Sequence, residues 1–171
     1  MDVKNKPGVE EFLESLREIS GKQVEYRWGA SGQKNGGVWR CDCRGLIQWA
    51  LRLLGVRLSC PGTNWMIRRQ IAEPLPCGDG SGLKEGMLVF KYRADRAKLP
   101  AKYRLGGSAY DSRLGEKDVY HVGVVMSTSP LRILHCSSGK PALRTDTALG
   151  SWRLCGRLKE ECGLAGEAGD E

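Results

Sequence analysis

Residues 41–55, CDCRGLIQWALRLLG, contain the clearest helix signal in the chain and carry a cysteine where that helix begins. Asp42 is a residue type that caps helix N-termini, and Gly55 suits the end of a helix. The apolar positions recur at helical spacing and form a broad stripe: Leu46, Ile47, Ala50, Leu51 and Leu54. The sequence therefore predicts an amphipathic helix over residues 43–54, with Cys43 in its first turn.

The position of Cys43 favours a chemical role for its thiol. Free backbone amides and the dipole at a helix N-terminus favour a thiolate, and they can lower the pKa of a cysteine well below its free value of about 8.5. Arg44 adds a nearby positive charge. Gly45 has no side chain, which leaves room beside the sulfur for a substrate backbone. We expect Cys43 to be a nucleophile, against the alternative of a small buried cysteine.

A nucleophilic cysteine needs a base, and the chain has two histidines, His121 and His135. Both lie in segments that read as consecutive strands. A three-residue turn near 127–130, or a bulge, would place them on one face as diagonal neighbours, about 7–8 Å apart at the backbone. A two- or four-residue turn without a bulge would place them on opposite faces. We expect the shared face, where one imidazole accepts the thiol proton and the other orients the first ring.

Metal binding is a competing chemistry for the same region. The side chains of zinc-ligand type are Cys41, Cys43, His121, His135 and Cys136. However, Cys-x-Cys at a helix start is not the usual zinc-binding spacing, and adjacent residues on a strand, such as His135 and Cys136, point to opposite faces. We therefore expect no metal site and no cofactor.

Along the rest of the chain, predicted helices come first and predicted strands follow. Residues 8–19 and 63–73 have helical periodicity, the VEYRW stretch reads as a short extended piece, and the rest of 24–37 reads as loop. Branched and aromatic residues predict strands over 87–92, 119–127, 131–136 and 151–158. Helices followed by an antiparallel sheet are the order expected of an α+β domain.

The charge of the chain is uneven along its length. Residues 1–159 carry 27 basic residues against 15 acidic ones, a net charge of +12, whereas residues 160–171 contain five acids and no base. A basic body favours polyanionic partners, such as an anionic cell-wall polymer, although solubility alone is an alternative reading. No nucleic-acid-binding motif is present. We expect one domain over 1–159, with a basic insert or lid at 91–118, and a solvated acidic tail.

Composition and cysteine usage narrow the class further. The 171 residues are 40% hydrophobic, which is enough for a core, and no apolar run approaches the roughly 20 residues that span a bilayer. The first twenty residues carry charges throughout and lack the apolar stretch of a secretory signal. Seven cysteines are an odd number, and a chain of this length does not need disulfides, so reduced and mostly buried thiols are expected.

Several motifs together resemble the NlpC-type cysteine peptidases of bacterial cell walls, which belong to the papain-like group. They are YRWGASGQ with CDCRGLIQWALRLLGV, then EGMLVF, then YHVGVVMS and ILHCSSG, and the resemblance covers roughly residues 10–158. It implies a helix carrying the cysteine, packed on an antiparallel sheet that carries the histidines. It also implies hydrolysis of peptide bonds in peptidoglycan stems, typically between D-isoglutamate and a diamino acid.

By position, the resemblance makes Cys43 the nucleophile, His121 the general base and His135 the orienting residue. Tyr26 matches a family tyrosine whose hydroxyl lies beside the cysteine, which suggests that it helps to hold an oxyanion; a packed aromatic next to Trp28 is the alternative. The expected oxyanion or substrate-binding residues are Tyr26, Trp28, Arg44 and Gly45. The chain departs from the family pattern at Arg44, where a small serine is usual, at Met87, where an acid is common, and in the long 91–118 insert.

The leading expectation is therefore a peptidoglycan peptidase that works through a thioester. An amidase, a deamidase or another acyl-transfer enzyme on the same fold is one alternative, and a non-catalytic wall-binding module is another. Without a secretory signal, we expect synthesis in the cytoplasm and action at the cell wall after non-classical release or as a phage component.

Overall fold

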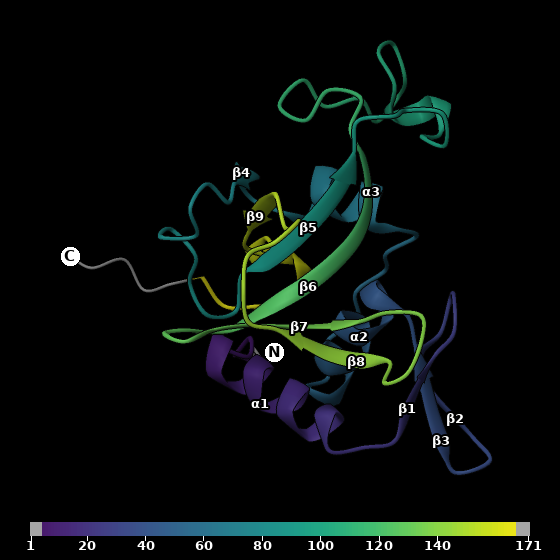
Figure 1. Cartoon of the computed structure of the whole chain (residues 1–171), viewed down its shortest axis with the longest axis vertical. Coiled ribbons are helices and arrows are strands. Elements are labelled where there is room, and N and C mark those ends of the chain that lie inside the picture. Colours follow the sequence, from purple (N-terminus) through teal and green to yellow (C-terminus); the bar gives the residue numbers. More distant parts are fainter. Residues whose placement is uncertain (1–4, 167–171) are drawn as a thin grey trace.

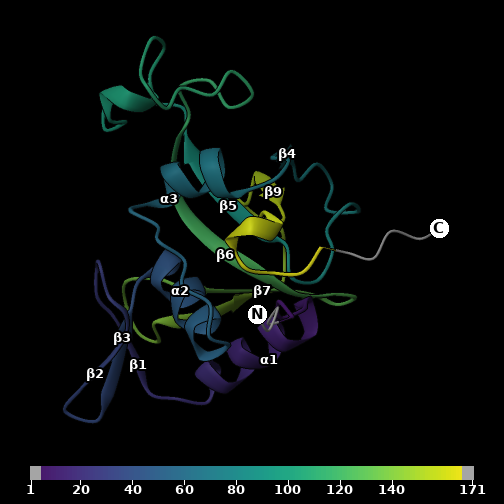
Figure 2. The same cartoon turned by 180° about the vertical axis from the view of Figure 1, so that it is seen from behind.

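A computed structural model describes residues 5–166, and helices cover one face of a strongly twisted sheet in it (Figures 1 and 2). Helix α1 (Val9–Ser20) and helix α2 (Cys43–Leu53) lie on that face. A three-stranded sheet of order β1-β3-β2 precedes α2, with β1 at Val24–Tyr26, β2 at Ser31–Asn35 and β3 at Val38–Cys41. The architecture is the expected α+β class.

The main sheet has six strands in the order β4-β9-β5-β6-β7-β8. Their bounds are Leu75–Pro76 (β4), Leu88–Arg93 (β5), Asp118–Thr128 (β6), Leu131–Cys136 (β7), Leu143–Asp146 (β8) and Leu154–Gly156 (β9). All of these pairings are antiparallel, and β5, β6 and β7 form its centre. The long hairpin of β6 and β7 is therefore the scaffold on which both histidines are held.

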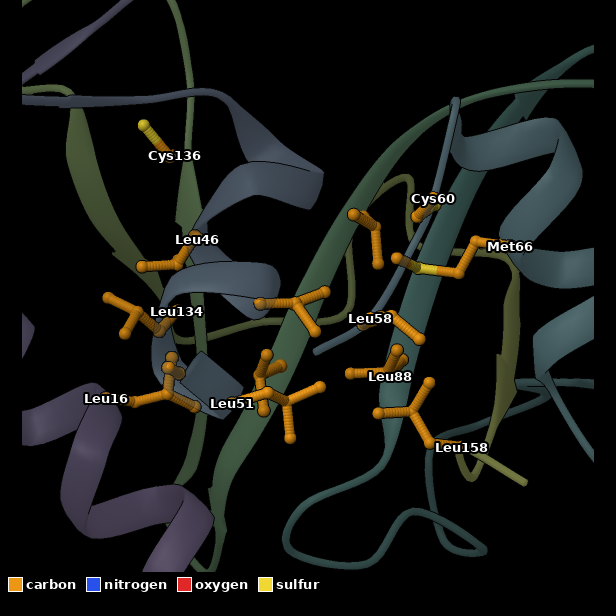
Figure 3. Packing of buried hydrophobic residues seen from close by; sticks show 14 of the residues in the cluster. Leu16, Leu46, Leu51, Leu58, Cys60, Met66, Leu88, Leu134, Cys136 and Leu158 are labelled. Carbon is orange, nitrogen blue, oxygen red and sulfur yellow. The ribbon is translucent and has the colours of Figure 1, made fainter. Parts of the chain in front are cut away.

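The larger buried cluster fills the space between the two helices and the sheet (Figure 3). Leu16 of α1 and Leu46 and Leu51 of α2 pack toward Leu88 of β5 and Leu134 of β7, and all five are at most 4% exposed. Burying side chains of this size contributes roughly 1.5–3 kcal/mol each, before the entropy cost of ordering the chain. This packing fixes the position of α2, and with it Cys43, relative to β6.

A second cluster lies on the opposite face of the sheet. Trp152 is 1% exposed there, and it packs with Val89, Val125 and Ile133 from β5, β6 and β7. Gly123 lies directly beneath the indole, because a Cβ at this position would come within 2.9 Å of the Trp152 ring. A glycine at this point of β6 thus allows the tryptophan to lie flat against the sheet.

The 91–118 insert joins β5 to β6 and projects beyond the end of these strands (Figure 1). Leu99, Tyr103 and Ala109 form a small cluster of their own, against which Trp65 packs. Trp65 ends the short helix α3 (Thr63–Trp65), which continues as a π-helix over Met66–Gln70. The insert is thus a folded unit that rests on this helical segment, and its role as a lid over substrate stays a prediction.

Arg68 joins the insert to the rest of the domain. Its guanidinium is 3% exposed, donates to the carbonyl of Lys117 at 2.9 Å and to the side chain of Asn64 at 2.9 Å, and stacks on Tyr103 at 5.0 Å. Asn64 in turn donates to Asp118, which begins β6, and accepts from the amide of Val119. One buried side chain therefore links the insert, the π-helix and the strand of His121.

Replacing Arg68 with methionine should lower the free energy of unfolding by about 3 kcal/mol, because several buried hydrogen bonds to a charged group are lost together. Urea unfolding measures this change. Arg96→Met is the matched control, since it removes an exposed ion pair with Glu116 and should leave the free energy of unfolding almost unchanged. Equal losses in the two variants would contradict the anchoring role of Arg68.

Most of the expected elements are present, with differences where polar residues dominate. The helices at 8–19 and 43–54, the VEYRW strand and the four later strands are confirmed to within a few residues. Strands β2, β3, β4 and β8 were not expected, and the third helical segment ends at Gln70, before residue 73. Within residues 5–166, no helix has the length and apolar character that crossing a bilayer requires.

The prediction of a solvated acidic tail is wrong for residues 160–166. Glu160–Cys162 forms a 3-10 turn, Leu164 is 6% exposed in the larger cluster, and the amide of Ala165 donates to the carbonyl of Pro7 at 2.9 Å. Residues 160–166 therefore pack against the start of α1. Residues 167–171 lie outside the described part of the chain.

Candidate active site

Cys43 begins α2, and the local sequence fixes the start of this helix. The side chain of Asp42 is 3% exposed and accepts two backbone N–H groups, from Gly45 at 2.7 Å and from Gly29 at 2.7 Å. The first bond caps the helix, and the second ties it to the loop after β1. The expected capping role of Asp42 is confirmed.

The Cys43 sulfur lies beside the strand that carries His121. The backbone amides of Val122 and Arg44 act on this sulfur and lower the pKa of the thiol. Pairing between β6 and β7 ends at Val124 and Leu134, before it would reach Val122, and α2 contacts both strands here. The thiol is thus within the electrostatic influence of the Val122 amide on the strand of His121.

The acidity of Cys43 differs from the expectation. Burial raises the pKa of the Cys43 thiol to about 12, and the charge of Asp42 raises the pKa further, while the amides of Val122 and Arg44 lower it. The helix N-terminus was expected to outweigh the other effects, and this prediction was wrong because the loss of solvation is larger. The resting thiol is therefore protonated, and its proton must leave during attack on a substrate.

The β6–β7 hairpin brings the two histidines together. Its turn has two residues, since Thr128 pairs with Leu131, but a bulge at Met126 shifts the register before Val125 pairs with Ile133. The bulge that was expected as one of two alternatives is therefore confirmed. His121 Nε2 lies 2.8 Å from His135 Nδ1, with the two rings nearly perpendicular at 82°.

Two further polar groups continue this chain of contacts. His135 is 4% exposed, and its Nε2 lies 3.1 Å from the Asp146 carboxylate on β8. The Ser137 hydroxyl lies 3.0 Å from His135 Nδ1 and 3.4 Å from His121 Nε2. A carboxylate on Nε2 of His135 favours the tautomer with a proton on this nitrogen. His135 Nδ1 then accepts the proton on Nε2 of His121, which leaves Nδ1 of His121 as a base.

Trp152 covers these contacts from the side opposite α2. Its ring stacks on His121 with centroids 5.4 Å apart and meets His135 edge-on at 5.2 Å, while its indole N–H donates to Asp146 at 2.9 Å. Excluding water strengthens the hydrogen bonds beneath the ring. Burial lowers the pKa of His121 to about 4, and the charges of His135 and Lys91 lower the pKa as well, so this imidazole is neutral near pH 7.

Among the described residues, no hydrogen bond joins the Cys43 thiol to the His121 imidazole. Within residues 5–166, the imidazole hydrogen bonds run between the two rings and to Ser137 and Asp146, and none reaches the Cys43 thiol. Such contacts are often long before substrate binds and shorten in the complex. The catalytic roles of Cys43, His121 and His135 therefore stay predictions that this arrangement supports.

The two aromatic residues expected near the cysteine lie at different depths. Tyr26 is half-buried at the end of β1, and the charges of Cys43, Asp42 and Cys136 act with burial to raise the pKa of its hydroxyl. The Tyr26 hydroxyl therefore keeps its proton near neutral pH. Trp28 is 83% exposed and lines a separate hollow of about 330 Å³ with Gly29 and Arg40.

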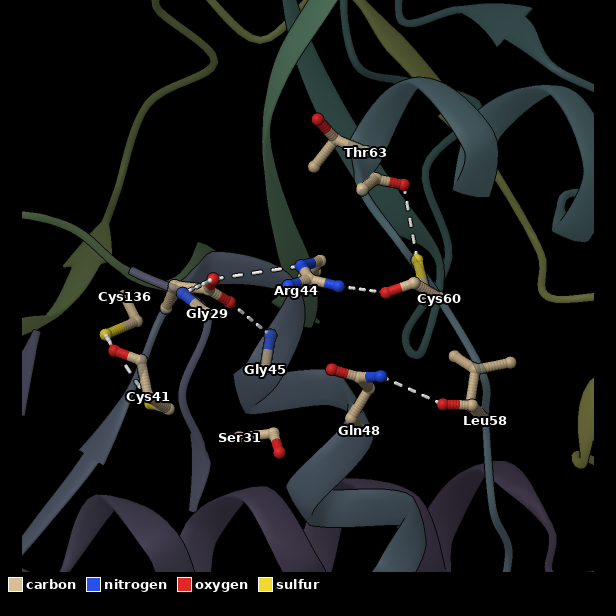
Figure 4. A network of polar contacts seen from close by, with 12 residues as sticks. Gly29, Ser31, Cys41, Arg44, Gly45, Gln48, Leu58, Cys60, Thr63 and Cys136 are labelled. Carbon is tan, nitrogen blue, oxygen red and sulfur yellow. Dashed lines mark hydrogen bonds and ion pairs between the residues drawn. The ribbon is translucent and has the colours of Figure 1, made fainter. Parts of the chain in front are cut away.

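Arg44 and Gly45 serve the local packing around the cysteine (Figure 4). The Arg44 guanidinium donates to the carbonyl of Cys60 and lies 3.7 Å from the Asp42 carboxylate. Gly45 is buried, and a Cβ there would lie 1.9 Å from the carbonyl oxygen of Ala30. The expectation that Gly45 leaves room for substrate is wrong, because the Ala30 backbone occupies that space. Substrate binding by Arg44 stays a prediction.

The cysteines are all free, as expected, and five of the seven are buried. The Cys41 and Cys136 sulfurs lie 3.6 Å apart beneath the site, and the Cys136 thiol also contacts the Cys41 carbonyl. Among the residues that the structure describes, no three histidine, cysteine or acidic side chains are arranged to hold a metal ion.

Sequence reasoning missed Asp146, Ser137 and the shielding role of Trp152. Asp146 ends β8, whose residues are all half-buried or exposed, so this strand has no alternation of apolar and polar positions. Trp152 precedes β9 in a segment that was expected to be a strand, but nothing in the sequence indicates which ring it covers. Ser137 directly follows His135 and Cys136, and only this proximity could have singled it out.

The pH dependence of Cys43 reactivity follows from the two shifted pKa values. Hydrolysis needs a neutral His121, so its rate should fall as pH drops through about 4 and not near the ordinary histidine value of 6.5. Alkylation of Cys43, followed by mass spectrometry of its peptide, should keep rising with pH toward about 12. Cys43→Ala controls for the other thiols. A plateau of alkylation near neutral pH would contradict a resting thiol that is protonated.

Comparison with known proteins supports the fold. A solved structure of NlpC1 from Trichomonas vaginalis matches 93% of this chain with a TM-score of 0.53 and 18% sequence identity. The chain spans 45% of the length of that protein. No protein-family model matches the chain, and no curated protein sequence matches it.

This likeness concerns the arrangement of helices and strands. The chain has an NlpC-like α+β fold, consistent with the papain-like architecture that the resemblance implied. At 18% identity the match carries no residue roles. The argument about chemistry therefore depends on the contacts around Cys43 and the two histidines.

Proposed function

We propose that the protein is a cysteine hydrolase that cleaves an amide bond through a thioester. The observation that carries this proposal is the position of the Cys43 sulfur. It lies at the N-terminus of α2, where the Val122 amide of the His121 strand acts on it, while His121 is held at 2.8 Å by His135, with Asp146 behind. A nucleophile, a base and an orienting group in this order are the elements of a catalytic triad.

In the proposed reaction, Nδ1 of His121 accepts the Cys43 proton as the sulfur bonds to the substrate carbonyl carbon. The imidazolium that forms beside the sulfur favours the thiolate, which offsets the high pKa of the resting thiol. The carbonyl oxygen becomes an oxyanion, for which the Tyr26 hydroxyl and the Cys43 backbone N–H are the expected donors. His121 then protonates the leaving amine, and water hydrolyses the thioester.

Peptidoglycan stem peptides are the proposed substrate class, with the bond between D-isoglutamate and a diamino acid as the proposed cleavage site. The resemblance of the motifs to cell-wall peptidases supports this choice. A cavity of about 620 Å³ adjoins the site, and Tyr26, Glu25 and Lys140 are among its lining residues. Side chains of both charges suit a peptide with carboxylate and amine groups.

The proposed place of action is the bacterial cell wall, reached by non-classical release or as a phage component. The net charge of +12 over residues 1–159 supports binding to anionic wall polymers. The exposed cations of the insert, such as Arg93, Lys98 and Lys102, add to this basic surface. Binding to anionic polymers should weaken as salt rises.

The raised pKa of Cys43 favours a second candidate, a non-catalytic wall-binding module that keeps the fold. Digestion of purified muropeptides separates the candidates. The peptidase proposal predicts a free diamino-acid fragment identified by mass. An amidase would release the intact stem peptide from its sugar, and a binding module would retain uncut muropeptides.

Tyr26→Phe tests the oxyanion role. We expect kcat to fall by about 100-fold with little change in KM, since one donor to the transition state is lost while the ring remains. Steady-state kinetics on a fluorogenic stem peptide measure both constants. Tyr110→Phe is the matched control in the insert. An unchanged kcat would make Tyr26 a packing residue only.

A further inference from the structure

A second pair of cysteines lies at the edge of the main sheet, where β5 separates β9 from β6. Cys155 in β9 pairs with Leu75 in β4, and the Cys77 amide donates to the Arg153 carbonyl at 2.8 Å. Cys77 and Cys155 are diagonal neighbours across these strands, and each is 6% exposed in the second cluster. The backbone thus directs both thiols to one face.

The two thiols interact with each other. Their interaction raises the pKa of Cys77 and lowers the pKa of Cys155. The charge of Arg153 lowers the pKa of Cys77 in turn. Each of these two cysteines is 6% exposed, which distinguishes the pair from the fully buried pair Cys41 and Cys136.

Both cysteines line a cavity of about 250 Å³, and Met87 lines it with them. Met87 is half-buried against the same cluster, and its sulfur accepts the Lys84 amide at 3.4 Å, which leaves it a further lone pair. The remaining walls are mostly apolar or backbone: Ala72, Glu73, Leu75, Pro76, Gly82, Gly156 and Arg157. The cavity therefore gathers three sulfur-bearing side chains.

These sulfur donors favour one kind of metal ion. Thiolates and thioethers are soft donors that favour Cu(I), whereas Mg²⁺ and Ca²⁺ need oxygen ligands and structural zinc sites need four ligands. Cu(I) is satisfied by two or three sulfurs. We propose that Cys77, Cys155 and Met87 form a binding site for a soft monovalent metal ion, and that this ion is Cu(I).

The binding of Cu(I) to this site balances in charge and in protons. Cu(I) bonds to the sulfurs of Cys77 and Cys155, each thiol releases its proton to solvent, and no electron is transferred. The resulting dithiolate centre carries one negative charge, and the neighbouring Arg153 offsets it. Met87 supplies a neutral third donor, so its loss should weaken the site less than loss of either cysteine.

An anaerobic titration of the full chain with Cu(I), in competition with the chromophore bicinchoninate and with ascorbate present, tests the proposal. The wild type should take one ion per chain from the competitor. Cys77→Ser and Cys155→Ser should lose this ion, and Met87→Leu should bind about tenfold more weakly. The controls Cys162→Ser and Cys43→Ala should bind as the wild type does. This readout is independent of peptide hydrolysis.

X-ray absorption of the Cu(I)-loaded wild type covers the case in which a cysteine variant fails to fold. Two or three sulfur neighbours of copper, reduced by one in Met87→Leu, support the site. The proposal is overturned if the wild type leaves all Cu(I) with the competitor, or if Cys77→Ser and Cys155→Ser retain the ion. It is also overturned if the copper has nitrogen or oxygen neighbours instead of sulfur.

Discussion

Cys43→Ala should reduce hydrolysis of stem peptides by at least about 10⁴-fold, because no other group can form the thioester. Alanine fills the same space at the start of α2, and the cap from Asp42 to the Gly45 amide remains, so the fold should persist. Mass analysis of the products and kcat/KM on a defined peptide measure the loss. Thermal unfolding of the variant checks that the domain is intact.

Cys162→Ser is the matched control for Cys43→Ala. It also removes one thiol, but from the 3-10 turn at Glu160–Cys162, which packs against the larger cluster. Its activity should equal that of the wild type. Equal activity of Cys43→Ala and wild type would rule out the proposed nucleophile and leave the binding-module candidate.

Substitutions of His121 and of the residues that orient it should lower kcat by graded amounts. His121→Ala should lower kcat by about 10⁴-fold, because the thiol, with its high pKa, then has no proton acceptor. His135→Ala should cost about 100-fold, since the His121 ring loses its partner at 2.8 Å. Asp146→Asn should cost about tenfold, because it acts on the base only through His135.

The pH profile of kcat distinguishes residues that position the His121 ring from residues that only stabilise the fold. Loss of the His135 ring removes a charge that lowers the pKa of His121, so the acid limb should move from about pH 4 toward higher pH in His135→Gln. A variant that only destabilises the domain would lower activity without moving this limb. If His135→Ala and Asp146→Asn retain full kcat, the proposed orienting chain is wrong.

Segments with strong apolar periodicity predicted the secondary structure reliably. The apolar stripe from Leu46 to Leu54 predicted α2 almost to the residue, and the cap at Asp42 fixed where it begins. The shared face of His121 and His135 followed from the alternation of strands, together with a bulge that the sequence could suggest but not locate. These features are local, so a single sequence contains them.

Features that depend on the third dimension could not be foreseen. The pKa of Cys43 depends on how deeply the cluster beneath α2 buries the sulfur, and the position of Asp146 depends on β8, a strand with no buried side chain. Gly45 was interpreted as space for substrate, whereas the loop backbone at Ala30 fills that space. In each case the deciding partner is remote in sequence.

The bulge at Met126 makes the site sensitive to the length of the β6–β7 hairpin. Side chains alternate along a strand, so any change of one residue between the two imidazoles reverses the side of the sheet on which one of them emerges. Changes of two residues preserve the facing pair. Evolution can therefore lengthen or shorten this hairpin only in even steps, unless a second irregularity restores the parity on which the pair of rings depends.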